Sequence, residues 1–292
     1  MTRLRATWLC TVLCLSLVLV APVVAQPRPM NGAPLDPAAT PSAEASSDDL
    51  RQAERELARS MMDNPRNPLV EIVTSEGDLY LELFEQAAPR NTALVLQLAQ
   101  EPTYYYDGLG FTDATPDLYI ELGDLAGSGL STDDEINGRG LGLEQQPLLD
   151  ANGRPHSWLN VSDETDFQRK VLAPLYRSMG ITDRTQLESQ QDAVISRLQQ
   201  MNLMQVYEMM GYRYNAQLAS RRPVSNSVLM TSHGPGTNNG HLVITLGDTP
   251  WLTGTHTVVG RLVSGQAIAR LISRQPPESI RIQQLRYVDE LP

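Results

Sequence analysis

Apolar runs of strand length occur in two separate regions of the chain. In the first region, Leu69–Thr74 and Leu79–Phe84 flank the polar stretch Ser75-Glu76-Gly77-Asp78, whose glycine suits a hairpin turn. In the second region, three runs are short and rich in β-branched residues, as buried strands are, and a last run alternates apolar and polar positions. We therefore predict further strands at Val228–Thr231, Leu242–Leu246, Thr257–Leu262 and Ser279–Tyr287.

Three helices are predicted beside these strands. Ala88-Pro89 places proline near the first turn of a helix that continues over Ala93–Gln100. Gly265–Ser273 has the apolar spacing of a short amphipathic helix. Leu50–Met62 follows the polar start Ser46-Ser47-Asp48-Asp49, which is typical of a helix N-terminus.

The segment between the two strand regions, residues 137–224, has helical rather than strand periodicity. Ser162-Asp163-Glu164 can cap a helix over Thr165–Met179, and Thr185-x-x-Glu188 reads as the capping box of a long helix that ends near Met210-Gly211. Apolar residues recur along that helix as a stripe that would face a core: Leu187, Val194, Leu198, Met201, Met204 and Tyr207. The alternative is an adaptable client-binding surface, made by Met201, Met204, Met209 and Met210.

The N-terminus has the pattern of a secretory signal. Arg3 and Arg5 precede the apolar run Ala6–Val20, and Val23-Val24-Ala25 offers a small-residue cleavage site. The alternative is an uncleaved membrane anchor, for which the run is short. We expect cleavage near Ala25 and a secreted or periplasmic protein. After the signal, residues 26–66 are expected to form a disordered tether followed by the helix over Leu50–Met62.

Composition excludes several classes of function. Both cysteines, Cys10 and Cys14, lie inside the signal, so the mature chain would have no disulfide or thiolate nucleophile. None of the four histidines is paired at metal-ligand spacing, and we expect no metal and no cofactor. Loss of Arg3 and Arg5 leaves 21 basic against 34 acidic residues, a net charge of −13. This charge disfavours nucleic acid and anionic membranes as partners.

The residues around Trp251 form the most specific motif of the chain. Pro250-Trp251-Leu252, with His256 just beyond, can wall a small apolar pocket. The string Trp251-Leu252-x-Gly254-x-His256-x-Val258-x-Gly260 follows Gly234-Pro235 and Thr237-Asn238, and the first region contains Tyr105-Tyr106-Asp107-Gly108-x-x-Phe111 and Pro116-x-x-x-Ile120-x-x-Gly123-Asp124. Together these residues resemble a cyclophilin-type peptidyl-prolyl cis-trans isomerase.

The resemblance implies a fold and a division of the chain. The fold class would be mainly β, a closed antiparallel eight-stranded barrel capped by two helices. Residues 67–136 and 225–292 would form the barrel, and residues 137–224 would be a helical insertion into it. The signal would occupy residues 1–25.

The resemblance also implies an activity, the rotation of the bond that precedes proline. That rotation has a barrier of about 20 kcal/mol because the amide is conjugated. A catalyst needs an apolar slot for the proline ring, and donors that bind the twisted amide more tightly than the planar one. No cofactor is required. The partners would be proline-containing segments of unfolded or envelope proteins.

Carried over residue by residue, the resemblance names a site that has lost one key group. The family's arginine is replaced by Asp113, which cannot donate a hydrogen bond when ionised. The other candidate catalytic residues are Glu121, His241 and His256. The candidate substrate-binding residues are Phe111, Leu118, Tyr119, Thr231, Ser232, Val243, Trp251 and Leu252.

Loss of one preorganised donor commonly costs about a hundred- to a thousandfold in rate, so we expect an isomerase with weakened turnover. Arg139 or another arginine of residues 137–224 would have to approach Asp113 in space to replace the lost charge. Three other readings remain: a non-catalytic proline-peptide-binding chaperone, an envelope scaffold module, and a hydrolase with Asp113 and Glu121 as its acid/base pair.

Overall fold

The computed structural model describes residues 47–100, 102–124 and 126–288. The predicted signal and most of the predicted tether lie outside the described residues. Helix α1 (Ser47–Ser60) packs on the sheet through Ala58, which is fully buried. Arg55 of this helix forms an ion pair with the buried carboxylate of Glu71, at 2.5 Å between Nη2 and Oε2. In the described part of the chain, no helix is long and apolar enough to span a membrane.

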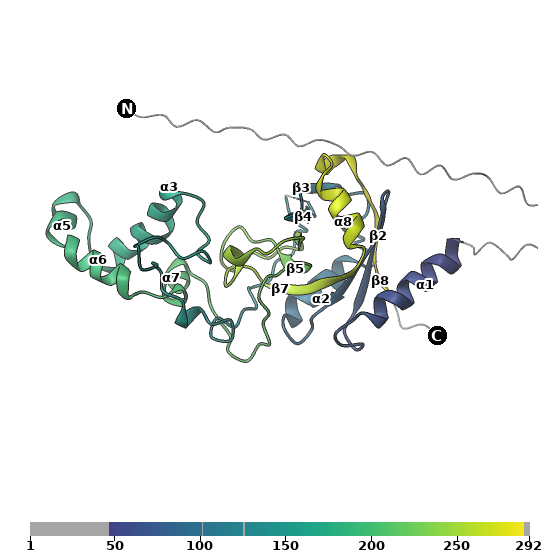
Figure 1. Cartoon of the computed structure of the whole chain (residues 1–292), viewed down its shortest axis with the longest axis horizontal. Helices are drawn as coiled ribbons and strands as arrows, with labels where there is room; N and C mark the ends of the chain where they lie inside the picture. The colour runs from purple at the N-terminus through teal and green to yellow at the C-terminus, as the bar shows by residue number, and fades with distance from the viewer. Residues whose placement is uncertain (1–46, 101, 125, 289–292) are drawn as a thin grey trace, which may run out of the picture. The chain divides into compact units, whose positions relative to one another are not determined.

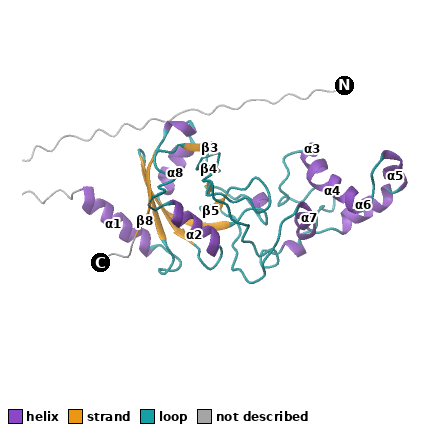
Figure 2. Cartoon of the chain, turned by 180° about the vertical axis from the view of Figure 1, so that it is seen from behind, coloured by secondary structure: helices purple, strands orange, loops and turns teal. Residues whose placement is uncertain are grey.

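One antiparallel sheet, drawn in orange in Figure 2, forms the body of the protein. It has eight strands in the order β3-β4-β6-β5-β7-β2-β1-β8. The mainly-β, eight-stranded prediction is therefore confirmed. The predicted strands agree with the observed ones to within a few residues, and two short strands that periodicity did not predict are added. The strands are β1 (Leu69–Thr74), β2 (Gly77–Leu83), β3 (Phe111–Thr115), β4 (Tyr119–Leu122), β5 (Ser227–Met230), β6 (Leu242–Thr245), β7 (Val258–Ser264) and β8 (Ile282–Val288).

The main core lies on one face of this sheet. Its largest fully buried side chains come from the paired strands β1 and β2, with Ile72, Leu79 and Leu81 fully inaccessible to solvent. Helices α2 (Pro89–Leu98) and α8 (Gln266–Ser273) contribute Leu98 and Ile272 to the same cluster. Both helices were predicted. In α8, Ile272 is buried and Ile268 partly buried, but Leu271, predicted on the same face, is 43% exposed.

The sheet is not a closed barrel, and that part of the fold prediction was wrong. The edge strands β3 and β8 form no continuous ladder, and they meet through a single isolated bridge between Gly110 and Arg281. Two backbone hydrogen bonds support the bridge, between Ile282 and the segment Gly108–Leu109. The physical reason is that β3 has only five residues and turns into β4 at once, so it offers β8 little backbone to pair with.

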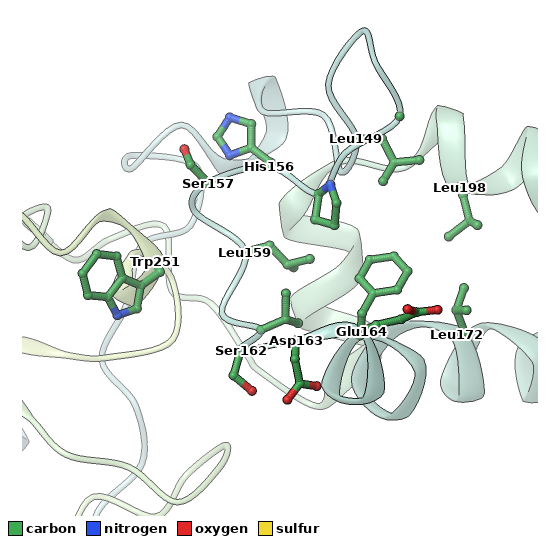
Figure 3. Close-up of a pocket in the computed structure, with 14 residues that line it drawn as sticks. Leu149, His156, Ser157, Leu159, Ser162, Asp163, Glu164, Leu172, Leu198 and Trp251 are labelled. Atoms are coloured by element: carbon green, nitrogen blue, oxygen red, sulfur yellow. The ribbon is translucent and has the colours of Figure 1, made fainter.

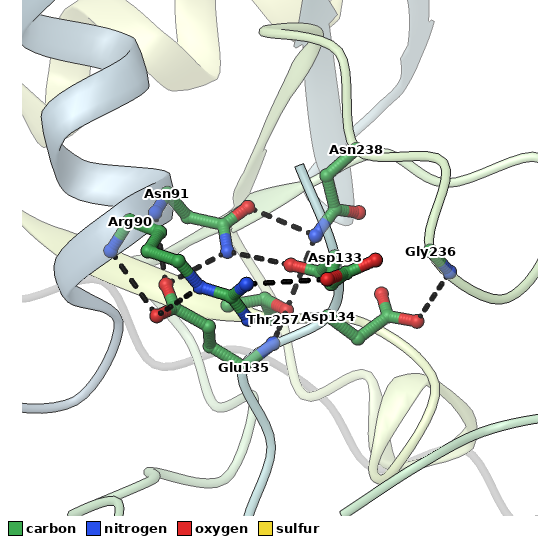
Figure 4. A network of polar contacts seen from close by, with 8 residues as sticks. All are labelled: Arg90, Asn91, Asp133, Asp134, Glu135, Gly236, Asn238 and Thr257. Carbon is green, nitrogen blue, oxygen red and sulfur yellow. Dashed lines mark hydrogen bonds and ion pairs between the residues drawn. The ribbon is translucent and has the colours of Figure 1, made fainter. Parts of the chain in front are cut away.

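The N-terminus of α2 is capped by a distant side chain. Ala88 at the N-cap has no side-chain cap of its own. Instead, the buried carboxylate of Glu135 accepts hydrogen bonds from the backbone N–H groups of Arg90 (3.1 Å) and Asn91 (2.8 Å) (Figure 4). The Glu135 backbone N–H donates to Thr257 Oγ1, so one residue ties α2 to the segment before β7. A carboxylate at this place also matches the positive end of the helix dipole.

Residues between β4 and β5 carry five short α-helices and have a hydrophobic core of their own. The helices α3, α4, α6 and α7 gather in one group (Figure 2; α3, α6 and α7 also in Figure 1), around buried residues that include Leu175, Val194 and Tyr207. The elements are η1 (Leu143–Gln145), α3 (Glu164–Phe167), η2 (Gln168–Leu172), α4 (Ala173–Ser178), α5 (Arg184–Ser189), α6 (Gln191–Gln200) and α7 (Leu203–Met210).

The predicted long helix over residues 185–210 is three helices. Its N-cap is Asp183, which accepts from the Gln186 backbone N–H, rather than Thr185. Asn202 starts α7 with a capping box to Gln205, and Met201 before it is extended. Asparagine hydrogen bonds to nearby backbone groups, which favours a new helix start over a continuous helix.

The apolar stripe along these helices faces the core, as the first interpretation predicted. Met201 and Tyr207 are buried, and Met204, Met209 and Met210 pack partly buried against the same cluster. The alternative, an exposed methionine surface for clients, is not what the structure has.

Candidate functional site

The strand register places five residues in one row across the sheet. Asp113, Glu121 and Val243 are predicted site residues, and Leu229 and Val258 are their neighbours in the row. Asp113 on β3 pairs with Glu121 on β4, and Glu121 pairs with Val243 on β6. Val243 then pairs with Leu229 on β5, and Leu229 with Val258 on β7. Directly paired residues of neighbouring strands lie on the same face of a sheet. The row therefore joins an acidic end to an apolar end.

The apolar end is a small hydrophobic cluster separate from the main core. It contains the buried residues Leu229, Val243 and Val258 together with Phe84 and Ala87. Tyr119 and Leu252 pack against it partly buried. The structure thus brings together three of the predicted substrate-binding residues: Tyr119, Val243 and Leu252.

The acidic end of the row has no cationic partner. The exposed carboxylate of Asp113 accepts from the Tyr119 hydroxyl (2.7 Å) and from the Ala114 backbone N–H (2.8 Å). Within the described ranges it takes part in no ion pair. The guanidinium of Arg139, which we considered as a replacement, pairs instead with Glu144 at 2.9 Å.

Glu121 is the residue of the row that titrates near neutral pH. Burial first, and the negative charge of Asp113 second, raise the pKa of Glu121 from 4.5 to about 7. Glu121 is therefore partly protonated at neutral pH, and a protonated carboxyl group can donate a hydrogen bond. The nearest imidazole nitrogen, His241 Nε2, is 3.8 Å from Glu121 Oε2.

His241 is buried and neutral. Burial, and then the charge of His233, lower the pKa of His241, against a smaller opposing effect of Asp124. Its Nε2 lies 2.7 Å from Thr112 Oγ1, and its Nδ1 has no hydrogen-bond partner among the described residues. An unpaired buried N–H is more costly than an unpaired acceptor, so we assign the proton to Nε2, which donates to Thr112.

Stability should depend on pH through Glu121. Its folded-state pKa is above the unfolded value, so its contribution is present below about pH 4.5 and is lost as pH rises through about 7. We expect Glu121→Gln to exceed wild type in free energy of unfolding by about 1–3 kcal/mol at pH 8.5, and to lose that advantage at pH 5. Urea unfolding at both pH values measures this. The exposed Glu208→Gln is the control, and an advantage of Glu121→Gln that is equal at both pH values would contradict the argument.

Trp251 and Leu252 lie in the short 3-10 helix η3 (Pro250–Leu252). His256 follows, with its Nδ1 3.0 Å from Thr255 Oγ1. Burial and the positive charge of Lys170 lower the pKa of His256 to about 4, so this imidazole is neutral at neutral pH. The helical residues approach this turn, because Lys170 donates to the Asn160 carbonyl (3.0 Å) and the Asn160 side chain donates to Thr255 Oγ1 (3.3 Å).

The remaining predicted substrate-binding residues, Phe111, Leu118, Thr231 and Ser232, lie outside the small hydrophobic cluster. Phe111 is buried in the main core rather than in the small cluster. Leu118 is half-buried at the start of β4, beside Gly247. Thr231 donates its backbone N–H to the His241 carbonyl. The Ser232 hydroxyl bonds within its own loop, to the Gly234 carbonyl and Thr237.

A cavity of about 770 Å³ lies where the helical residues meet Trp251. Its wall is mainly apolar, with Leu159, Phe167 and Leu198 as examples, and Trp251 is its one residue from outside the helical segment. Sequence reasoning missed this cavity, because its lining residues come from several helices and loops. The indole at Trp251 was the only signal. Among the described residues no group of three or more potential ligands is arranged to hold a metal ion.

Comparison with known proteins gives the following similarities. A family model described as cyclophilin type peptidyl-prolyl cis-trans isomerase/CLD matches residues 69–287. Peptidyl-prolyl cis-trans isomerase ppi1 of Schizosaccharomyces pombe is 25% identical over 209 residues, which cover 69% of this chain and 82% of that protein. Peptidyl-prolyl cis-trans isomerase-like 1 of Gibberella zeae is 35% identical over 68 residues, 21% of this chain and 42% of that protein.

Two further similarities are more limited. A Streptococcus pyogenes protein named as a bifunctional phosphatase/peptidyl-prolyl cis-trans isomerase is 38% identical over 85 residues, 28% of this chain and only 18% of that protein. A crystal structure of a Cryptosporidium parvum cyclophilin type peptidyl-prolyl cis-trans isomerase has a TM-score of 0.45 and 18% identity, covering 77% of this chain and 99% of that one. The family model matches residues 69–287, more than half of the chain. The chain therefore belongs to the cyclophilin-type peptidyl-prolyl cis-trans isomerase family.

Proposed function

We propose that this protein is a peptidyl-prolyl isomerase of low turnover that acts on proline-containing segments of unfolded or envelope proteins. The observation that supports the low turnover is the cross-strand row, which ends in a carboxylate at the position where the family resemblance places an arginine. The apolar part of the row, Val243, Leu229 and Val258, lies in a buried cluster beside it, and Tyr119 and Leu252 pack on that cluster.

The chemistry follows from these groups. The partly exposed side chains of Tyr119 and Leu252, which pack on the buried apolar cluster, offer a surface for the proline ring. The rotating amide needs a donor at its nitrogen or carbonyl oxygen. Ionised Asp113 accepts hydrogen bonds, as it does from Tyr119, and supplies no donor. Protonated Glu121, its cross-strand neighbour, is the donor that remains on the row. A neutral carboxyl group donates more weakly than a guanidinium, which accounts for a slow enzyme.

The test is an isomerisation assay on a short proline peptide, with Trp251→Ala beside wild type. We expect measurable turnover in wild type and a loss of about tenfold in kcat/KM in the variant, because the family resemblance places the indole beside the proline slot, next to Leu252 of the apolar cluster. Tyr287→Ala, an exposed aromatic residue on the far edge strand β8, is the matched control. Equal rates in wild type, Trp251→Ala and Tyr287→Ala would refute the proposal.

A second candidate function is a non-catalytic proline-peptide-binding chaperone or envelope scaffold module. The observation that favours it is again Asp113, which leaves the row without a fixed cation. Titration of the same peptide separates the two functions. Saturable binding without any isomerisation supports the binding module, and turnover supports the enzyme.

We also propose that the protein is exported, to the periplasm or outside the cell. The support is the apolar run Ala6–Val20 after Arg3 and Arg5, with the small residues before Gln26. Mass determination of the protein from its native cell measures this, and a chain that still begins at Met1 would contradict it.

A further inference from the structure

The cavity beside Trp251 is a groove with two different ends (Figure 3). Trp251 stands at one end, and Leu172 and Leu198 stand at the other, with the stretch from Ser157 to Ser162 between them. Most of the lining is apolar, and the volume of about 770 Å³ is large enough for several side chains of a ligand. None of its lining residues belongs to the row of strand residues described above.

The groove adjoins the candidate site at the turn η3. Trp251 lines the groove, while the next residue, Leu252, packs on the cluster that contains Val243. Two hydrogen bonds join the helical segment to the residues that follow η3. Asn160 Nδ2 donates to Thr255 Oγ1 (3.3 Å), and Tyr214 donates its hydroxyl to the Gly254 carbonyl (2.9 Å).

Gly254 shows how closely the two sides approach. Its φ is +88°, and a Cβ at this position would lie 2.6 Å from Leu143 Cδ1. The absent side chain therefore lets the helical segment sit directly on the turn that carries Trp251. A ligand bound at Leu252 could therefore extend past the turn at η3 to Trp251 and into the groove.

The rim of the groove is acidic. Asp163 and Glu164 are exposed lining residues, and no lysine or arginine lines the groove. Of the nearby cations, Arg169 and Lys170 are both paired with Asp166, at 2.5 and 2.7 Å. Arg154, between the lining residues Gly153 and Pro155, is exposed and lies near Asp150, whose pKa it helps to lower. A ligand with large apolar groups and a positive charge complements this combination.

We propose that the groove is an extended binding site for the same polypeptide substrate, and that it selects proline segments flanked by a large apolar residue and a lysine or arginine. This inference rests on the proposed function, because it takes the proline to lie at the apolar cluster. An extended peptide advances about 3.3 Å per residue, so flanking residues on one side of the proline can reach Leu198 while the ring stays near Leu252.

The experiment compares a short proline tetrapeptide with two labelled peptides of about twelve residues that share its core. One long peptide carries leucine, phenylalanine and lysine beside the core on both sides, and the other replaces lysine with glutamate. Fluorescence anisotropy gives Kd, and the isomerisation assay gives kcat/KM. We expect wild type to bind the lysine peptide about tenfold or more tightly than either other peptide.

Two variants of the groove test the assignment, each with a matched control. Phe167→Ala removes an apolar wall and Glu164→Lys reverses a rim charge, and both should abolish the advantage of the lysine peptide. Both should leave kcat/KM for the tetrapeptide unchanged. Tyr287→Ala and Glu208→Lys change the same kinds of residue away from the groove and should preserve the advantage. Thermal unfolding confirms that each variant is folded.

The outcomes separate this inference from the proposed function. If the tetrapeptide is turned over but the lysine peptide has no advantage, the groove inference is wrong and the proposed function stands. If no peptide is isomerised, the anisotropy measurement still tests whether the groove binds the lysine peptide more tightly than the other peptides. A hydrophobic dye that binds in the groove and is displaced by neither long peptide would show a small-molecule site and overturn the inference.

Discussion

Replacing Asp113 with arginine and Glu121 with glutamine together raises kcat/KM for a proline peptide on the order of a hundredfold. The double variant supplies a permanent cationic donor at the acidic end of the row. It also removes the one carboxylate that would neutralise that donor, because Glu121 is directly opposite position 113. Asp113→Arg alone should give a smaller gain, since ionised Glu121 would form an ion pair with the new guanidinium.

The measurement is the isomerisation rate at about pH 7.5 for wild type, both single variants and the double variant. Asp113→Asn is the matched control, because it removes the charge and adds no cation, and it should change the rate only a few-fold. If the double variant binds the peptide as wild type does and shows no gain in rate, then the missing arginine is not what limits turnover.

Removing the carboxylate of Glu135 destabilises the fold by about 2–4 kcal/mol. This buried group accepts from two backbone N–H groups at the start of α2 and from the Asn91 side chain at 2.9 Å (Figure 4). Glu135→Ala leaves those donors without an acceptor at a buried helix start, where no local residue can replace it. Urea unfolding monitored by circular dichroism gives the free energy.

Asp133→Ala is the control for this network. Asp133 also pairs with Arg90, at 3.1 Å, but its side chain is 73% exposed, so its loss should cost less than about 1 kcal/mol. Glu135→Gln should be intermediate, because one of its two oxygens becomes a donor. Equal stability of Glu135→Ala and Asp133→Ala would show that the cap contributes nothing.

The sequence predicted the strands well because local pattern and burial agree there. Leu69–Thr74 is predicted and observed with identical bounds, and all six of its residues are buried. Closure of the sheet was predicted from the family resemblance, and no local pattern in Phe111–Thr115 indicates how far β3 pairs with β8. Pairing between distant edges depends on the length of the strands and on the twist of the whole sheet.

The candidate site was predicted in part. The resemblance named Val243, Leu252 and Tyr119, and the structure gathers them in one cluster. The raised pKa of Glu121 depends on burial, which no sequence pattern reports. The groove depends on the packing of separate helices, and the broken helix at Met201 and Asn202 shows how a single capping residue changes that packing.

The weak pairing between the edge strands β3 and β8 affects which part of the sheet can open locally. A continuous ladder opens only when many hydrogen bonds break together, whereas the Gly110–Arg281 bridge is isolated. The hairpin of β3 and β4, which carries Asp113 and Glu121, can therefore separate from β8 while the core around β1 and β2 stays folded. Amide hydrogen exchange should be faster along Phe111–Thr115 than along Leu69–Thr74, and a peptide that bridges the hairpin and β6 should slow it.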